Sequence, residues 1–115
     1  MIAGLGTDII EIERIQRVEE KGNRLSRRIL SPEEMERYRQ FADAGRRMEY
    51  LAGRFAVKEA YSKALGTGIG SAAAFRDIVC LNDAGGRPYI ANDQHAHVSI
   101  SHSRAYVVAT VIIER

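Results

Sequence analysis

The stretch GRFAVKEAYSKALGTGIG, residues 53–70, decides how the rest of the chain is interpreted. Its first part has the composition of a helix, in which successive side chains lie about 100° apart around the axis. Arg54, Lys58 and Ser62 then fall on one stripe, while most other positions are apolar or small. We therefore expect a long, largely buried central helix whose charged groups need partners inside the protein.

Glu59 and Lys63 lie on the neighbouring stripe of this helix and leave two interpretations open. One is an internal ion pair of Glu59 with Lys58 or Lys63, which leaves Arg54 and the other lysine unexplained. The other is a phosphate site, in which the cations hold the phosphate and Glu59 holds a metal ion.

The glycines that follow, Gly66, Gly68 and Gly70, would let backbone N–H groups approach an anion closely. A glycine directly after a helix is also a common way to end one. The run does not match a P-loop, because no Gly-Lys-Ser/Thr opens a following helix.

The composition indicates one small domain. With 115 residues, 45% hydrophobic and 28% charged, the chain is ordinary for a globular protein. The single cysteine, Cys80, excludes an internal disulfide. No apolar run approaches the roughly 20 residues of a membrane span, and no signal peptide precedes the first strand. We expect one domain over residues 1–115, in the cytoplasm and not bound to a membrane.

Basic side chains gather between residues 14 and 28, and they are Arg14, Arg17, Lys21, Arg24, Arg27 and Arg28. Such a cluster suggests an acidic partner, although a solvated helix face has the same composition. Nucleic acid is disfavoured as the partner, because 7% aromatic residues and no tryptophan leave little surface for base stacking.

Residues 1–10 alternate as a strand does, which places Asp8 on the same face as Gly4 and Gly6. Glycines in a strand often mark the close approach of a ligand or another backbone. An aspartate beside them is out of place in a core. Asp8 either caps the helix that follows or binds a metal together with a second carboxylate from elsewhere.

Helical signals follow this strand. Residues 12–18 carry an apolar stripe, and a basic, partly helical stretch continues to residue 30. The Ser-Pro-Glu-Glu sequence that begins at Ser31 predicts a capped helix running to about residue 41. A polar link at residues 43–47 then leads into the central helix, which we expect to end near Leu65.

The remainder of the chain has strand patterns. Residues 76–81 are β-like, and the turn-rich segment 82–88 predicts a hairpin that returns through Tyr89. Residues 97–103 alternate, and residues 105–113 are apolar on both faces, which predicts a strand covered on both sides. In so small a domain one cover could be another subunit. The fold class is therefore α+β: an N-terminal strand and helices, including the long central one, followed by an antiparallel sheet.

Three separated segments resemble the holo-acyl-carrier-protein synthases, the small bacterial 4′-phosphopantetheinyl transferases. GLGTDI at residues 4–9, followed by Glu11 and Arg14, is similar to the family's first motif. The second, Phe-x-x-Lys-Glu-Ala-x-x-Lys, stands as FAVKEAYSK at residues 55–63 with Gly-Thr-Gly after it. VSISH at residues 98–102 is similar to the third. Gly-Arg-Pro in the predicted turn also fits, while the valine of FAVKEAYSK is larger than the residue usual there.

This resemblance implies a 4′-phosphopantetheinyl transferase fold and the reaction of that family. The phosphopantetheine arm of coenzyme A would move to a serine of apo acyl carrier protein, with release of adenosine 3′,5′-bisphosphate, in support of fatty acid biosynthesis. Asp8 and Glu59 would hold Mg²⁺, and Lys63 would neutralise the leaving phosphate. Either Glu59 or a metal-bound water would take the serine proton.

The resemblance also implies where the partners bind. The predicted contacts to coenzyme A are Arg54, Lys58, Ser62, Lys63, Gly66, Thr67, Gly68, His102 and Arg46. For His102 the alternative is a hydrogen-bonded structural histidine. Arg14, Arg24 and Arg28 would receive the acidic carrier protein. Family members of this length form homotrimers with active sites at subunit interfaces.

Two other functions fit part of the pattern. A different metal-dependent phosphotransferase or phosphohydrolase could use Asp8 and Glu59 on another nucleotide. A non-catalytic module could bind nucleic acid through residues 14–28. Turnover with coenzyme A, or a metal-independent affinity for DNA or RNA, would distinguish them.

Overall fold

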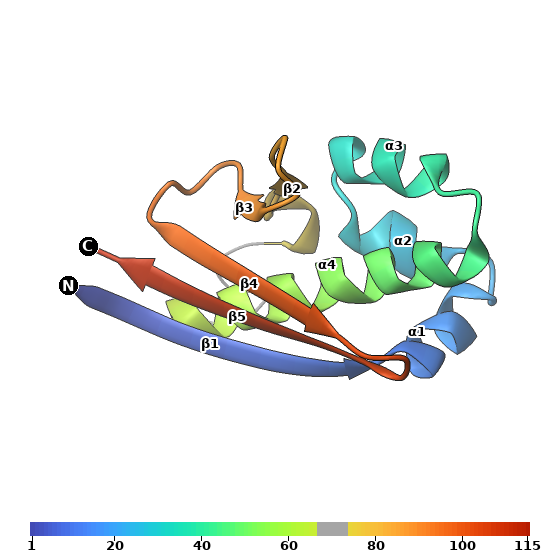
Figure 1. The fold of residues 1–115 in the computed structure, drawn as a ribbon, viewed down its shortest axis with the longest axis horizontal. Helices are drawn as coiled ribbons and strands as arrows, with labels where there is room; N and C mark the ends of the chain where they lie inside the picture. The colour runs from blue at the N-terminus through green and yellow to red at the C-terminus, as the bar shows by residue number, and fades with distance from the viewer. Residues whose placement is uncertain (67–73) are drawn as a thin grey trace.

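A computed structural model of the chain describes residues 1–66 and 74–115. Its elements alternate little between helix and strand, with the helices concentrated in the first part of the chain and the short strands in the last (Figure 1). In order they are β1 (Ile2–Glu11), α1 (Ile12–Glu19), α2 (Arg24–Ile29), α3 (Pro32–Gln40), α4 (Ala44–Leu65), a 3₁₀ turn (Phe75–Asp77), β2 (Cys80–Asn82), β3 (Pro88–Ile90), β4 (Ala96–His102) and β5 (Tyr106–Glu114). The predicted α+β class, with a long central helix and antiparallel sheets, is confirmed.

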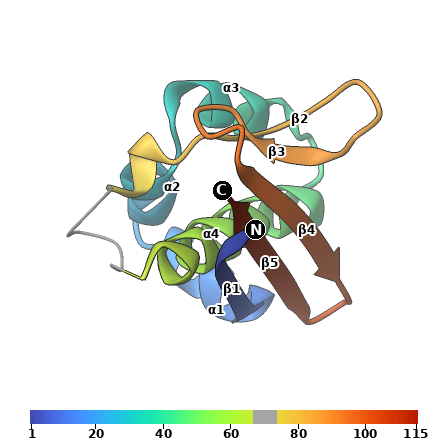
Figure 2. The same ribbon diagram turned by 90° about the vertical axis from the view of Figure 1, so that its left-hand side faces the viewer.

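The main sheet has three strands in the order β1-β5-β4, and both neighbouring pairs are antiparallel. Helix α4 packs along one face of this sheet, chiefly against β1 and β5 (Figures 1 and 2). Helices α2 and α3 and the separate β2–β3 hairpin lie on the side of α4 away from β1. The central helix is therefore enclosed by three groups of elements, which explains its burial.

Two glycines let the backbones of β1 and α4 approach each other closely. A Cβ atom added to Gly6 would lie 1.9 Å from the carbonyl oxygen of Ala60, and one added to Gly4 would lie 2.0 Å from that of Ala64. No side chain larger than hydrogen fits at such distances. The expectation that these glycines mark the approach of another backbone is confirmed, and the partner is the central helix.

The other face of the main sheet is not covered by any element of the described chain (Figure 2). We call it the outer sheet face, and it is defined by the exposed apolar side chains Leu5, Ile9 and Tyr106. Across the ladder, Leu5 is paired with Ile112 and Ile9 with Val108, so the apolar surface continues onto β5. Of the two covers predicted for the last strand, α4 supplies one, and the second, which another subunit could provide, stays a prediction.

Helix boundaries follow local capping. Ser31 forms the predicted capping box with Glu34, because each accepts a hydrogen bond from the backbone N–H of the other. The predicted polar link at residues 43–47 is mostly wrong. The side chain of Asp43 accepts from the N–H of Arg46 at 2.9 Å and starts α4 at Ala44 instead.

Two further local predictions need correction. Most of the strand expected at residues 76–81 is a 3₁₀ turn and a bend, and the strand itself begins only at Cys80. On α1, Val18 is exposed and Glu19 is buried. The reason is that the Glu19 carboxylate accepts from the N–H of Ser26 at 3.0 Å and from the hydroxyl of Tyr38 at 2.8 Å.

Among the residues that the structure describes, no helix has the length and apolar character needed to cross a membrane.

The contact between β1 and α4 predicts a specific sensitivity. Gly6→Ala should destabilise the protein by about 1–3 kcal/mol, because the new methyl group meets backbone that cannot rotate away. Urea unfolding followed by circular dichroism measures the loss. Gly85→Ala is the matched control, since its nearest neighbour is the Asp83 side chain at an ordinary 3.5 Å, and it should change stability by less than about 0.5 kcal/mol. Equal losses in the two variants would contradict the close-approach argument.

Candidate functional site

Two clefts flank helix α4, and together they hold most of the predicted site residues. The carboxylate cleft, of about 370 Å³, is lined by Asp8, Arg14, Phe55 and Glu59 among others. The arginine cleft, of about 630 Å³, is lined by a polar set that comprises Arg37, Arg46, Glu49, Arg54, Asn82 and His102.

Asp8 is held in the carboxylate cleft by Lys63. The Lys63 ammonium donates to Asp8 Oδ1 at 3.0 Å and to the carbonyl of Thr7 at 3.0 Å. The other carboxylate oxygen, Asp8 Oδ2, is buried and has no hydrogen-bond partner among the described residues. The alternative that Asp8 caps the next helix is wrong, because the N-cap of α1 is Glu11.

Glu59 reaches the same cleft from α4, and within the described part of the chain it forms no ion pair with Lys58 or Lys63. Its pKa is raised, first by burial and then by the nearby charge of Asp8, with Lys63 opposing the shift. Two carboxylates therefore share a partly buried space in which their charges repel each other. A bound cation would relieve that repulsion.

The donor set of this cleft fits a hard divalent cation. Carboxylate oxygens are the protein ligands that Mg²⁺ uses, commonly one or two of them with water and substrate phosphate completing the shell. The buried oxygen of Asp8 without a partner is available for this purpose. Residues 1–66 and 74–115 contain no group of three or more His, Cys, Asp or Glu side chains that could hold a metal.

Lys58 requires a correction. Its side chain is fully buried and its ammonium lies 2.6 Å from Glu34 Oε1, so it faces the core and not a ligand. The predicted internal ion pair exists, but its acid is Glu34 and not Glu59. Ser62, on the same stripe, is 3% exposed and lines neither cleft. Both residues are removed from the expected contacts to coenzyme A on these grounds.

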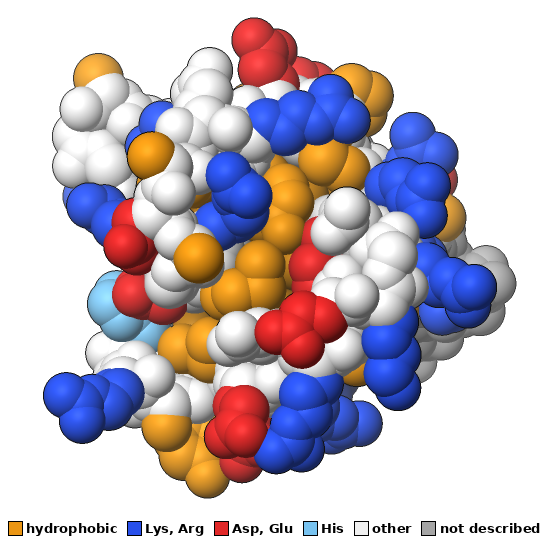
Figure 3. All heavy atoms as spheres, turned by 90° about the vertical axis from the view of Figure 1, so that its right-hand side faces the viewer, with side chains coloured by type: hydrophobic (Ala, Val, Ile, Leu, Met, Phe, Trp, Pro, Cys, Tyr) orange, Lys and Arg blue, Asp and Glu red, His pale blue; other side chains and the backbone are white. Residues whose placement is uncertain are grey.

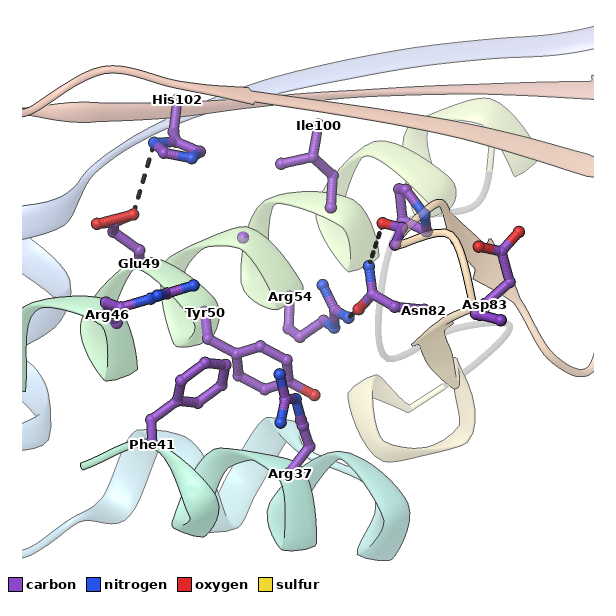
Figure 4. Close-up of a pocket in the computed structure, with 14 residues that line it drawn as sticks. Arg37, Phe41, Arg46, Glu49, Tyr50, Arg54, Asn82, Asp83, Ile100 and His102 are labelled. Carbon is purple, nitrogen blue, oxygen red and sulfur yellow. Dashed lines mark hydrogen bonds and ion pairs between the residues drawn. The ribbon is translucent and has the colours of Figure 1, made fainter. Parts of the chain in front are cut away.

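The arginine cleft is built between α3, α4, β2 and the end of β4 (Figure 4). Arg54 is 4% exposed, donates to the side-chain oxygen of Asn82, and stacks its guanidinium over the ring of Tyr50 at 4.4 Å. On the opposite wall, His102 Nδ1 lies 3.5 Å from Glu49 Oε2. Fixed cations thus line a wide opening, which suits a phosphorylated ligand.

The structure divides the predicted site residues. Arg46, Arg54 and His102 line one cleft, whereas Lys63 is bonded to Asp8 beside the other. Gly66 ends α4 with a positive φ of 79°, so its capping role is confirmed. Thr67 and Gly68 lie outside the described residues.

Sequence reasoning missed several residues of the arginine cleft. Asn82 looked like part of a turn, and its contact with Arg54 spans 28 positions of sequence. Glu49 and Tyr50 stand one helical turn before Gly53 and Arg54, at the i−4 positions. Helical spacing from Arg54 could have identified Tyr50, whereas no local signal identifies Asn82.

The predicted carrier-binding arginines lie near the carboxylate cleft. Arg14 lines that cleft, and Arg24 and Arg28 are exposed on α2. Figure 3 shows many Lys and Arg side chains around a strip of apolar side chains at this end of the molecule. The arrangement offers positive charge beside the two carboxylates.

Comparison with known proteins gives one consistent family. A sequence profile described as the 4′-phosphopantetheinyl transferase superfamily matches residues 4–111. The holo-[acyl-carrier-protein] synthase of Staphylococcus carnosus is 50% identical over 116 residues, covering 100% of this chain and 99% of the relative. That of Anoxybacillus flavithermus is 50% identical over 118 residues, covering 100% and 98%.

Solved structures agree with the sequence relatives. A holo-(acyl-carrier-protein) synthase from Bacillus anthracis in complex with CoA (3′,5′-ADP) superposes with a TM-score of 0.91 at 44% identity, covering 99% of this chain and 97% of that one. The Helicobacter pylori holo-[acyl-carrier-protein] synthase in complex with coenzyme A has a TM-score of 0.82 at 31% identity, covering 96% and 99%.

The charges of the carboxylate cleft predict how Glu59 titrates without metal. Asp8→Asn should lower the Glu59 pKa, because a neighbouring negative charge is removed, and Lys63→Met should raise it, because a positive charge is removed. Carboxyl ¹³C NMR titration in the presence of a chelator measures both. Glu13→Gln, on the exposed face of α1, is the control and should leave the Glu59 pKa unchanged. Shifts of the same sign in the two cleft variants would contradict the arrangement.

Proposed function

Because the chain belongs to the 4′-phosphopantetheinyl transferase superfamily, we propose that it transfers 4′-phosphopantetheine from coenzyme A to a serine of an apo acyl carrier protein. The observation that carries the proposal is the grouping of Asp8, Glu59 and Lys63 at one cleft, next to exposed arginines. These are the acids and the base of the motifs that resemble the family. Adenosine 3′,5′-bisphosphate is the second product.

The residues of the carboxylate cleft supply what this reaction needs. The serine oxygen forms a bond to the phosphorus that carries pantetheine, and the bond from that phosphorus to the bridging oxygen of the pyrophosphate breaks. The leaving group departs with the electron pair as the 5′-phosphate of adenosine 3′,5′-bisphosphate. Glu59, whose pKa is raised, accepts the serine proton, and the Lys63 ammonium balances the charge on the leaving phosphate.

Asp8 and Glu59 are proposed to hold Mg²⁺, whose contribution when bound is to neutralise the pyrophosphate oxygens. The buried oxygen of Asp8 that lacks a hydrogen-bond partner supports this assignment. Lys63 orients the Asp8 carboxylate through its bond to the other oxygen.

The arginine cleft is proposed to bind the nucleotide end of coenzyme A. Arg46, Arg54 and His102 would contact its 3′-phosphate, with Asn82 fixing the guanidinium of Arg54. Glu49 and Asp83 in the same cleft limit the net positive charge, which disfavours the binding of arbitrary polyanions.

The basic end of the molecule is proposed to bind the carrier protein. Acyl carrier proteins are acidic, so Arg14, Arg24 and Arg28 would attract them and bring the serine to the carboxylate cleft. The reaction serves fatty acid biosynthesis and would take place in the cytoplasm, where coenzyme A and apo carrier protein are both available.

We further propose that the protein is a homotrimer and that each active site combines the carboxylate cleft of one subunit with the arginine cleft of its neighbour. Two observations support this. One chain presents the two predicted halves of the site as separate clefts. The outer sheet face, with Leu5, Ile9 and Tyr106 exposed, needs a cover.

The transfer itself predicts a change in the mass of the carrier. Incubation with coenzyme A, Mg²⁺ and an apo acyl carrier protein should add one phosphopantetheine group, detected by mass spectrometry. EDTA should abolish the gain, and Glu59→Gln should slow it by at least about 100-fold. Glu13→Gln makes the same chemical change on the surface and should keep full activity. An unmodified carrier with the wild-type protein, across several apo carriers, would refute the proposed function.

The shared site predicts complementation between subunits. Glu59→Gln and Arg46→Ala/His102→Ala should each be nearly inactive alone. Trimers formed from an equal mixture should recover about a quarter of the wild-type rate, because that share of interfaces pairs two intact halves. A mixture of Glu59→Gln with Asp8→Asn, both altered in the same cleft, is the control and should recover nothing. Mixed trimers without recovered activity would place both clefts of a site in one subunit.

A further inference from the structure

Glu34 and Lys58 form an ion pair that neither cleft uses. Both side chains are 0% exposed, and Lys58 Nζ lies 2.6 Å from Glu34 Oε1. Neither residue lines the carboxylate cleft or the arginine cleft. Burying two charges is costly, and a pair of apolar side chains of the same size would often stabilise a protein as well or better. Stability alone is therefore a weak reason for the pair.

The carboxylate of Glu34 accepts hydrogen bonds from two other parts of the fold besides Lys58. Oε1 also accepts from the N–H of Ser31 at 2.8 Å, and Oε2 accepts from the N–H of Cys80 at 2.7 Å. The Lys58 ammonium in turn donates to the carbonyl of Ile29 at 2.5 Å. One buried pair thus joins the end of α2, the start of α3, the middle of α4 and the start of β2.

Both ends of this network stand next to proposed functional residues. On α4, Lys58 is followed directly by Glu59 and lies one helical turn after Arg54. On β2, Cys80 stands two residues before Asn82, which accepts from the Arg54 guanidinium across the arginine cleft. The Arg54–Asn82 bond ties β2 to α4 directly, and the Glu34–Cys80 bond ties β2 to α3, whose Glu34 is in turn bound to Lys58 of α4.

The directions of these bonds fix geometry. With Lys58 anchored to Glu34, α4 cannot rotate about its axis without breaking a buried charge pair. With the N–H of Cys80 anchored to the same carboxylate, β2 cannot slide along α4. Asn82 is thereby held level with Arg54 along the axis of α4, and Glu59 is held on the side of the helix that faces the carboxylate cleft.

We propose that Glu34 and Lys58 are a positioning pair for the transferase site, which sets β2 against α4 so that Asn82 and Arg54 form the wall of the arginine cleft. The inference rests on the proposed function for its kinetic consequence. Its structural consequence, the position of β2, is independent of any activity. Neither residue touches substrate, so neither is catalytic.

The test compares two ways of replacing the pair. Glu34→Leu/Lys58→Met removes both charges together and takes away the partners of the Ser31 N–H, the Cys80 N–H and the Ile29 carbonyl. Glu34→Gln/Lys58→Met also removes both charges, but it keeps a side-chain carbonyl that can accept from the N–H of Cys80. Tyr61→Phe is the control, because it removes a part-buried hydrogen bond of α4, to Asp93 at 2.7 Å, from a residue that lines neither cleft.

Two measurements are made on each variant. The first is the ¹H–¹⁵N spectrum of the Cys80 backbone and the Asn82 side-chain amide. The second is the pair of kinetic constants, KM for coenzyme A and kcat, determined separately at a temperature well below the midpoint of thermal unfolding. Glu34→Leu/Lys58→Met should shift both signals and raise KM about tenfold, the size expected when Asn82 no longer fixes the guanidinium of Arg54 and about one hydrogen bond to the ligand is lost. Glu34→Gln/Lys58→Met and the control should stay within about threefold of the wild-type KM.

The possible outcomes test the positioning role of Glu34 and Lys58 separately from the proposed transferase function. A folded Glu34→Leu/Lys58→Met protein with wild-type Asn82 signals and a wild-type KM would overturn the positioning role and leave a purely structural pair. If that variant does not fold, Glu34→Gln alone takes its place with the same expectation, because its carbonyl then serves the Lys58 and Ser31 donors and its NH2 group faces the N–H of Cys80. Shifted Asn82 signals together with a wild-type protein that transfers nothing would refute the proposed function while supporting the geometry.

Discussion

The contact between the backbone of β1 and the backbone of α4 constrains the rest of the structure. Gly4 and Gly6 leave room for the carbonyl oxygens of Ala64 and Ala60 where a side chain would otherwise stand. Asp8 follows on the same face of the strand, so the distance that the glycines set also brings its carboxylate to Glu59. The antiparallel ladder with β5 holds β1 in register along this contact. A site made by two elements thereby acquires a fixed spacing.

The charged side chains of helix α4 differ in how deeply they are buried, and their burial decides which groups each of them can contact. Lys58 is fully enclosed and has the fixed partner Glu34. Arg54 is nearly enclosed, bound to Asn82 on one side and open to a cleft on the other. The Lys63 side chain is 54% exposed and able to follow a substrate. Three cations of one helix therefore differ in exposure: one is a structural tie, and the other two are the proposed anion contacts, one fixed and one exposed.

Local sequence patterns predict much of the fold and part of the candidate site. Strand alternation gave the face of Asp8, the capping box at Ser31 fixed α3, and helical spacing grouped Arg54 with Lys58. The contacts that decide the roles of these cations are not local, because Lys58 meets Glu34 across 24 positions and Arg54 meets Asn82 across 28. A stripe of cations looks the same in sequence whether it faces a ligand or a buried acid, and for this reason the prediction that Lys58 contacts coenzyme A is wrong. The split into two clefts depends likewise on tertiary packing.

The ends of the chain meet in a way that has a mechanical consequence. The amino group of Met1 donates to the carbonyl of Arg115 at 3.0 Å, and the N–H of Arg115 donates back to the carbonyl of Met1 at 2.8 Å. β1 and β5 are antiparallel, so the first residue of β1 and the last residue of β5 are neighbours in the ladder. A force that pulls the two chain ends apart therefore breaks the hydrogen bonds of the ladder one pair after another and not all together. Such peeling reaches the pair of Asp8 with Ala109 only after the residues from Ile2 to Thr7 have been released. The carboxylate cleft thus lies at the part of the ladder that such a force separates late.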